Sequence, residues 1–180
     1  MSKLTDFKLL SFDVYGTLID YERGVLANLE PSLRNADDLD PKSILEISQP
    51  IFTNATIENP RQKYSDLLTA CHPQIIQKLG LPAPTEEESR AFGASVGTWP
   101  AWKDTVEALW RLKKNYKMVV LSNVDIASFE ENNKNSLDGF EWDLVLTAEE
   151  IGSYKPDLRN FEYMFKQVSY SLCLPNTPQT

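Results

Sequence analysis

The chain has 180 residues, of which 42% are hydrophobic, and a formal net charge of −8. This length suits one sizeable core with room for an inserted subdomain. The acidic balance, without any cluster of lysine or arginine, argues against nucleic acid or an anionic membrane as the main partner, although one positive pocket would be enough to hold a small anion.

The cysteine content and the hydropathy further limit the classes of protein to which this chain can belong. The two cysteines, Cys71 and Cys173, are too few for a disulfide framework. The N-terminus lacks a basic and apolar signal pattern, and no apolar run approaches the roughly 20 residues that cross a bilayer. We therefore expect a reduced, cytoplasmic protein without a membrane partner.

The first predicted strand ends at Phe12 and is followed at once by Asp13, a glycine turn and Thr17. Ligands of an open parallel sheet bind just past the carboxyl ends of its strands, so a carboxylate at this point is placed to meet a ligand. The alternative is that Asp13 caps the next helix or only marks a turn.

Residues 19–100 are predicted to be helices broken by prolines, without a strand of convincing length. Pro41 is well placed to begin a helix, and Thr85 followed by three glutamates is typical of another helix start. Cys71 and His72 are adjacent and so do not face each other on a helix. We interpret them as packing residues and not as a nucleophile pair.

An α/β pattern resumes near Trp102. An amphipathic helix is predicted over residues 104–113, and it leads into a buried strand that ends at Ser122 and Asn123. A further helix from residue 125 and a third strand over residues 142–147 precede Lys155. Crossovers of this kind imply a parallel sheet that is covered on both faces. Taken singly, Ser-Asn is usually a turn and Lys-Pro a solvated loop.

The three strand-end motifs together resemble those of the haloacid dehalogenase superfamily of hydrolases. They are Asp13-Val14-Tyr15-Gly16-Thr17-Leu18, Ser122-Asn123 and Lys155-Pro156. The first resembles the type II branch, the L-2-haloacid dehalogenases, and the resemblance runs from Phe7 to about Val168. It implies a Rossmann-like α/β core over residues 1–18 and 101–168, with a helical cap over residues 19–100 that closes over the active site.

The resemblance also implies a chemistry. Asp13 would act as the nucleophile and form a covalent ester, which splits one hard displacement into two easier steps. Lys155 would favour the ionised carboxylate, and Thr17 and Ser122 would donate hydrogen bonds that fix its rotamer. The Asn123 amide would donate to a leaving halide or to a substrate carboxylate.

Tyr15 separates two branches of the superfamily. Phosphatases carry a second aspartate at this position as the general acid for an alcohol leaving group. A halide leaves without a proton, so Tyr15 favours hydrolysis of a carbon–halogen bond in a small 2-haloacid, without a metal or other cofactor. The alternatives are a magnesium-dependent phosphatase of the same superfamily and, for Tyr15 itself, a packed aromatic residue.

Three features depart from the family pattern. Dehalogenases of this branch place an arginine in the cap, for which Arg61 is the candidate, although the sequence favours a solvated helix-end charge at this position. Phe161 stands where the family has a tyrosine. A fourth motif, a further strand ending in a small polar and acidic cluster, is missing, and residues 169–180 are predicted to be a disordered or irregular tail.

We therefore expect a core that is truncated on its C-terminal side and a chain with little or no turnover. A further alternative is a non-catalytic remnant that binds a partner or a small anion. The expected ligand is a small molecule, either a 2-haloacid or another small anion, and the sequence leaves a homodimer open.

Overall fold

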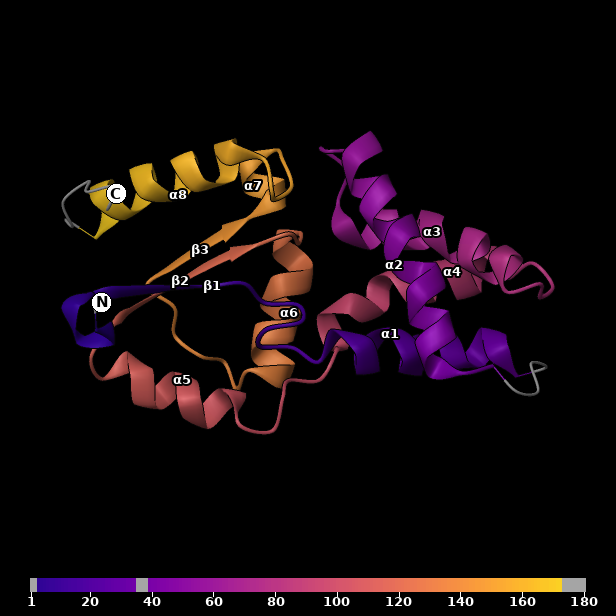
Figure 1. The fold of residues 1–180 in the computed structure, drawn as a ribbon, viewed down its shortest axis with the longest axis horizontal. Coiled ribbons are helices and arrows are strands. Elements are labelled where there is room, and N and C mark those ends of the chain that lie inside the picture. The colour runs from indigo at the N-terminus through magenta and orange to yellow at the C-terminus, as the bar shows by residue number, and fades with distance from the viewer. Residues whose placement is uncertain (1–2, 35–38, 173–180) are drawn as a thin grey trace.

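The computed structural model describes residues 3–34 and 39–172, and it places a small sheet and its covering helices beside a group of further helices (Figure 1). The sheet has three parallel strands in the order β1-β2-β3. Their bounds are Leu9–Phe12 for β1, Lys117–Ser122 for β2 and Leu144–Thr147 for β3. The predicted α/β architecture with a parallel sheet and a helical insert is confirmed.

The central strand explains why the sheet is covered on both faces. Met118, Val119 and Val120 of β2 are each fully buried. Pairing joins Leu9–Phe12 of β1 to residues 117–120, and residues 119–122 to Leu144–Thr147 of β3. Because successive residues of a strand point to opposite faces, an unbroken apolar run needs helices on both sides.

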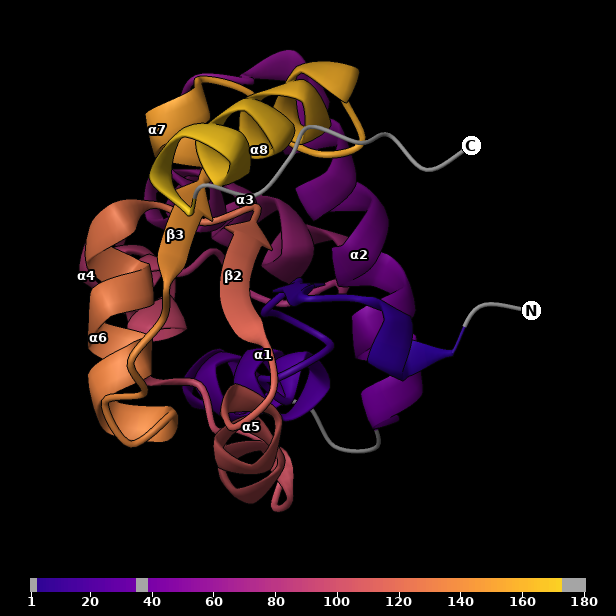
Figure 2. The same cartoon turned by 90° about the vertical axis from the view of Figure 1, so that its left-hand side faces the viewer.

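In the part of the chain that the structure describes, four helices belong to this half of the molecule. They are α5 (Thr105–Lys113), α6 (Ile126–Ser136), α7 (Ala148–Ile151) and α8 (Leu158–Ser171). Figure 2 shows α8 on one side of the sheet and α5 on the other, with α6 alongside. The helices predicted from residues 104 and 125 are confirmed.

The irregular tail predicted over residues 169–180 is wrong for its first three residues. Residues 169–171 belong to α8, because its apolar face continues: Val168 and Leu172 both pack against the cluster built by Val119, Leu121, Leu146 and Met164. The remainder of the predicted tail, residues 173–180 including Cys173, lies outside the described residues.

A short 3-10 helix, Leu4–Asp6, precedes β1. Within the described residues, the helical insert comprises four α-helices and two short 3-10 helices. They are α1 (Tyr21–Leu29), η2 (Glu30–Leu33), α2 (Pro41–Glu58), α3 (Tyr64–Lys78), α4 (Glu86–Ala94) and η3 (Ser95–Thr98). Among the described residues, none of the helices is long and apolar enough to cross a membrane.

The helix starts follow local capping chemistry. Asp40 accepts a hydrogen bond from the backbone of Ser43, with Pro41 in the first helical turn, and Thr85 forms a reciprocal capping box with Glu88. The expectation that prolines break the helices is partly wrong, because Pro50 lies inside α2 and Pro73 inside α3. Buried apolar residues on either side of each proline hold these helices against their neighbours, which offsets the lost backbone bond.

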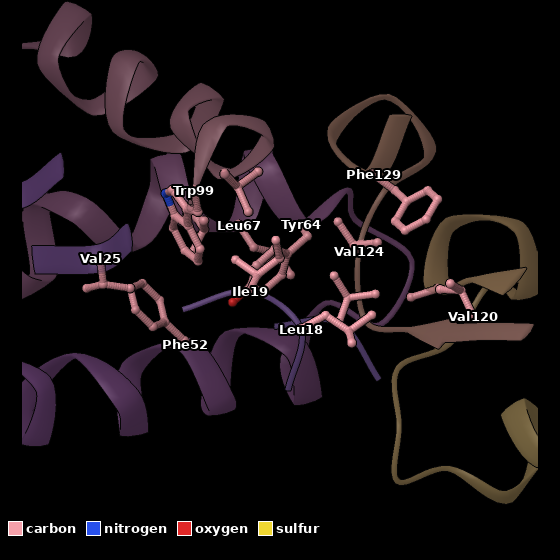
Figure 3. Close-up of a cluster of buried hydrophobic side chains, with 14 of the residues drawn as sticks. Leu18, Ile19, Val25, Phe52, Tyr64, Leu67, Trp99, Val120, Val124 and Phe129 are labelled. Carbon is pink, nitrogen blue, oxygen red and sulfur yellow. The ribbon is translucent and has the colours of Figure 1, made fainter. Parts of the chain in front are cut away.

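The two halves share one continuous core. Figure 3 shows Val25, Phe52 and Trp99 of the insert in the same cluster as Val120 and Phe129 of the sheet half. Two connections run side by side between the halves, because Asp20 N–H donates to the Pro100 carbonyl (2.8 Å) and Trp102 N–H donates to the Leu18 carbonyl (3.2 Å). The insert therefore sits at a fixed position over the carboxyl ends of the strands.

Candidate active site

An ion pair lies at the carboxyl end of the sheet. Asp13 follows β1 directly, and Lys155 comes from the loop between α7 and α8. The Lys155 Nζ atom donates to Asp13 Oδ1 (2.6 Å) and to the carbonyl of Leu121 (2.7 Å). The lysine side chain is 19% exposed and the aspartate side chain 41%. The ammonium group is therefore more buried than the carboxylate and offsets its charge. The carboxylate itself remains open to a ligand.

Asn123 holds the Lys155 loop in place. The Lys155 backbone N–H donates to Asn123 Oδ1 (2.7 Å), and Asn123 Nδ2 donates to the Lys155 carbonyl (3.1 Å). The sequence predicts this amide as a ligand for halide or carboxylate, but one of its two N–H groups is occupied in positioning the lysine. The cause is tertiary, because the end of β2 and this loop meet only in the folded chain.

Two further contacts support the same loop, and sequence reasoning missed both. The buried Asn160 donates to Ser153 Oγ (3.0 Å) and to the Asp157 carbonyl (3.1 Å). The Tyr154 hydroxyl donates across to the Gln62 carbonyl of the insert (2.6 Å). The peptide bond between Lys155 and Pro156 is cis. The only sequence signal for these roles is the polar residues close to the motif lysine.

Ser122 and Tyr15 line the same pocket as Asp13, and their buried hydroxyl groups have no hydrogen-bond partners among the described residues. The predicted bond from Ser122 to the carboxylate is therefore absent, although Ser122 lies in the pocket wall. The Tyr15 ring packs edge-on against Trp99, with centroids 5.6 Å apart. Burial raises the pKa of the Tyr15 phenol, and the nearby carboxylates of Asp125 and Asp13 raise it further. Tyr15 is thus a neutral aromatic wall.

Thr17 and Arg61 are not part of this group. Thr17 is exposed, and its backbone N–H closes the turn onto the Val14 carbonyl (3.2 Å). Its hydroxyl makes no bond to Asp13 within the described part of the chain, because the turn carries it to the surface. Arg61 is also exposed and lies in the connection after α2, beyond the last residue of that helix that faces the pocket. Neither Thr17 nor Arg61 lines the pocket that Asp13 and Lys155 face.

A pocket of about 570 Å³ lies between the strand ends and the insert. The sheet side contributes Asp13, Ser122, Asn123 and Lys155, with Tyr15 and Gly16 from the turn after β1. The insert side contributes one face of α2 and parts of α1 and α3, and Trp102 closes the rim. The residues from this side are Tyr21, Glu22, Gln49, Phe52, Thr53, Thr56 and Tyr64.

Two other groups of residues lie outside the pocket. His72 is buried, and its ring nitrogens bond the hydroxyls of Ser32 (3.0 Å) and Ser89 (3.2 Å). Burial raises the pKa of the Cys71 thiol to about 11. The two residues pack, as predicted.

Phe161 packs with the apolar cluster beneath α8. Within the described residues, no three His, Cys, Asp or Glu side chains gather as a metal site would require.

Comparison with known proteins gives one family and a consistent set of folds. A family model described as haloacid dehalogenase-like hydrolase matches residues 7–172. No curated protein sequence gave a match. The fold of the defluorinating L-2-haloacid dehalogenase Rha0230 superposes with a TM-score of 0.76 at 18% identity, covering 93% of this chain and 69% of that one.

Two more solved structures superpose on this chain. The L-2-haloacid dehalogenase PA0810 has a TM-score of 0.74 and 23% identity, over 94% of this chain and 72% of that one. The Xanthobacter autotrophicus L-2-haloacid dehalogenase with covalently bound chloropropionic acid has a TM-score of 0.73 and 18% identity, over 94% of this chain and 66% of that one. These TM-scores establish a shared fold. The activities remain those of the relatives.

Proposed function

Because this chain belongs to the haloacid dehalogenase-like hydrolase family, we propose that it hydrolyses the carbon–halogen bond of a small 2-halogenated molecule through an ester on Asp13. The observation that carries the proposal is the Asp13–Lys155 pair, which lies at the strand ends and faces a pocket large enough for a small substrate. The covalently bound chloropropionic acid of one structural relative supports the same kind of intermediate.

The first step is a displacement at carbon. An Asp13 carboxylate oxygen forms a bond to C2 of the substrate, the C2–halogen bond breaks, and the halide leaves with the bonding electron pair. Lys155 holds one carboxylate oxygen, which leaves the other to attack and limits the rotamers of the nucleophile. No proton is transferred in this step, so a neutral Tyr15 is compatible with it.

The second step consumes water. Water adds to the ester carbonyl, the bond between that carbonyl carbon and the substrate oxygen breaks, and the Asp13 carboxylate returns. The balance is one water consumed and one alcohol, one halide and one proton released. Aromatic side chains around the pocket, including Tyr15 and Tyr64, limit the water that can surround the reacting carbon.

A halide-release assay tests the proposal. Asp13→Asn should lower release from 2-chloropropionate or 2-chloropropionamide by at least about 10³-fold, because the amide is a poor nucleophile. Asp104→Asn, the same change at an exposed helix end without a capping bond, should leave release unchanged. In single-turnover hydrolysis in heavy-oxygen water, the label should appear first in the protein.

Three results would contradict the proposal. Label that passes directly into the product would exclude the ester. Full activity of Asp13→Asn would exclude Asp13 as the nucleophile. Release of phosphate from an aryl phosphate, abolished by a chelator and restored by magnesium, would move the chain to the phosphatase branch, whereas halide release is expected to survive the chelator.

A further inference from the structure

We infer that Asp125 and Glu149, neither of which lines the pocket, are positioning residues for the reaction at Asp13. Their carboxylates fix a short segment of the insert, residues 62–65, against the loops of the sheet half that carry the site. This inference rests on the proposed function and assigns to it residues that do not touch the substrate. A set of hydrogen bonds and ring contacts between the two halves supports it.

The Asp125 carboxylate binds both halves of the molecule at once. Its Oδ1 accepts from the backbone N–H of Ser128 in the first turn of α6 (3.0 Å), and its Oδ2 accepts from the backbone N–H of Ser65 at the start of α3 (3.1 Å). Asp125 is 2% exposed, and a hydrogen bond in such a low-dielectric setting is stronger than one in water. One buried carboxylate therefore joins the start of a helix of the sheet half to the start of a helix of the insert.

Glu149 repeats this arrangement from α7. Its Oε2 accepts from the backbone N–H of Ile126 in α6 (2.8 Å), and its Oε1 forms an ion pair with Lys63 Nζ (3.1 Å). The Tyr154 hydroxyl adds a further contact, because it donates to the Gln62 carbonyl (2.6 Å). The segment between α2 and α3 is thus held to the sheet half through its backbone at two points and through a side chain at a third.

Tyr64 lies within this segment and connects it to the site. Tyr64 is buried, it contributes to the pocket wall, and Figure 3 shows it in the core that the two halves share. Its ring centroid lies 6.3 Å from that of Tyr15 and 6.4 Å from that of Tyr154. Tyr15 is two residues after Asp13, and Tyr154 directly precedes Lys155. A displaced segment would therefore disturb both members of the ion pair, and small departures from a productive geometry cost large factors in rate.

Amide variants test this role because an amide cannot replace a bridging carboxylate. Glutamine has one acceptor oxygen and one NH₂ group, so Glu149→Gln cannot accept from both Ile126 and Lys63. It should lower kcat for halide release from 2-chloropropionate about fivefold and change KM by less than about twofold, because the residues that line the pocket are all retained. Asp125→Asn leaves a buried backbone N–H without an acceptor and should lower kcat about tenfold.

Glu150→Gln is the matched control. Glu150 is the next residue of α7, and its carboxylate accepts from the Tyr163 hydroxyl of α8 (2.8 Å), within the sheet half. This variant should leave kcat unchanged. Lys63 supplies a second comparison: Lys63→Met removes the ion pair and should lower kcat about threefold, whereas Lys63→Arg keeps a cation beside the carboxylate and should preserve kcat. Thermal melts identify an assay temperature at which every variant is folded.

Three kinetic results would overturn the inference. The first is an equal loss of kcat from Glu149→Gln and Glu150→Gln. The second is an equal loss from Lys63→Met and Lys63→Arg. The third is a loss that appears in KM alone, which would place the effect in substrate binding and not in the orientation of the reacting groups.

The inference and the proposed function fail in different ways. If the unaltered protein releases no halide, the proposed function is wrong, and amide hydrogen exchange then decides the inference. The Lys155 backbone N–H is bonded to Asn123 Oδ1 (2.7 Å), so its exchange rate reports on the site loop. Glu149→Gln should raise the exchange rates of the Ser65 and Lys155 amides about fivefold, and Glu150→Gln should raise neither. Faster exchange at Ser65 with an unchanged rate at Lys155 would show that the segment is not coupled to the site.

Discussion

At the scale of single residues, the buried hydroxyl of Tyr15 is unusual because it has no partner in the described part of the chain. Most buried polar groups form hydrogen bonds, and an unpaired one lowers stability. Tyr15→Phe removes that group while keeping the ring that packs against Trp99. We expect a melting temperature that is unchanged or raised by a few degrees.

Tyr154 provides the matched control, because its hydroxyl donates to the Gln62 carbonyl at 2.6 Å. Tyr154→Phe leaves that carbonyl without its donor and should cost about 1 kcal/mol, or about 2–4 °C for a chain of this size. Thermal melts of both variants give the comparison. Equal losses from the two substitutions would mean that the Tyr15 hydroxyl is bonded in solution.

At the scale of elements, Asp143 ties the start of β3 to its neighbours. Its carboxylate accepts from the ammonium groups of Lys113 and Lys117 and from the backbone N–H of Met118, each at 2.9 Å. Burial alone would raise the pKa of this carboxyl, but these three donors outweigh it and lower the pKa to about 2. The ionised form is therefore the one that stabilises the fold.

The sign of the pH dependence follows from that depressed pKa. The unfolded carboxyl titrates near about 3.9, so the stabilisation is complete above roughly pH 4 and is lost as the pH falls toward 2. Asp143→Asn should lower the free energy of unfolding by about 2 kcal/mol at pH 7 and by almost nothing at pH 2. Urea unfolding across this range measures it, with the exposed Asp104→Asn as control. A difference that stays constant with pH would refute the assignment.

At the scale of the whole molecule, the insert and the sheet half share one hydrophobic core. The fully buried Asn132 of α6 donates to the Trp99 carbonyl (2.9 Å) and, more weakly, to the Val96 carbonyl (3.5 Å) at the end of the insert. Ser136 donates to the Trp99 carbonyl as well (2.7 Å). The joint between the two halves is therefore hydrogen-bonded at its centre.

We expect one cooperative transition that includes both halves. Asn132→Ala should lower the stability of the whole chain by about 1–3 kcal/mol, since it removes the hydrogen bonds from the buried Asn132 side chain to the end of the insert. Melts followed by tryptophan fluorescence and by far-UV circular dichroism should shift together. Asn135→Ala, an exposed position on the same helix, should shift neither. Two separated transitions, only one of them moved by Asn132→Ala, would show that the halves unfold independently.

The sequence alone was enough for much of this molecule. Each strand is a short apolar run, and the helix starts at Pro41 and Thr85 carry their own capping residues. Because parallel strands end on one edge, the order of Asp13, Ser122 and Lys155 after successive strands also predicted that these residues meet. These features are local, or follow from the topology that local features define.

Tertiary structure decided which side chains line the pocket. Asn123 bonds to a loop 32 residues away, Thr17 turns out to the surface, and Arg61 ends beyond the pocket. Which residues of α2 line the pocket depends on which side of that helix packs over the strand ends. An amphipathic helix shows its apolar stripe in the sequence, but the partner of its polar side is fixed only when elements distant along the chain pack together. The family could thus be inferred from the motifs, whereas the residues that line the pocket were decided by the folded arrangement.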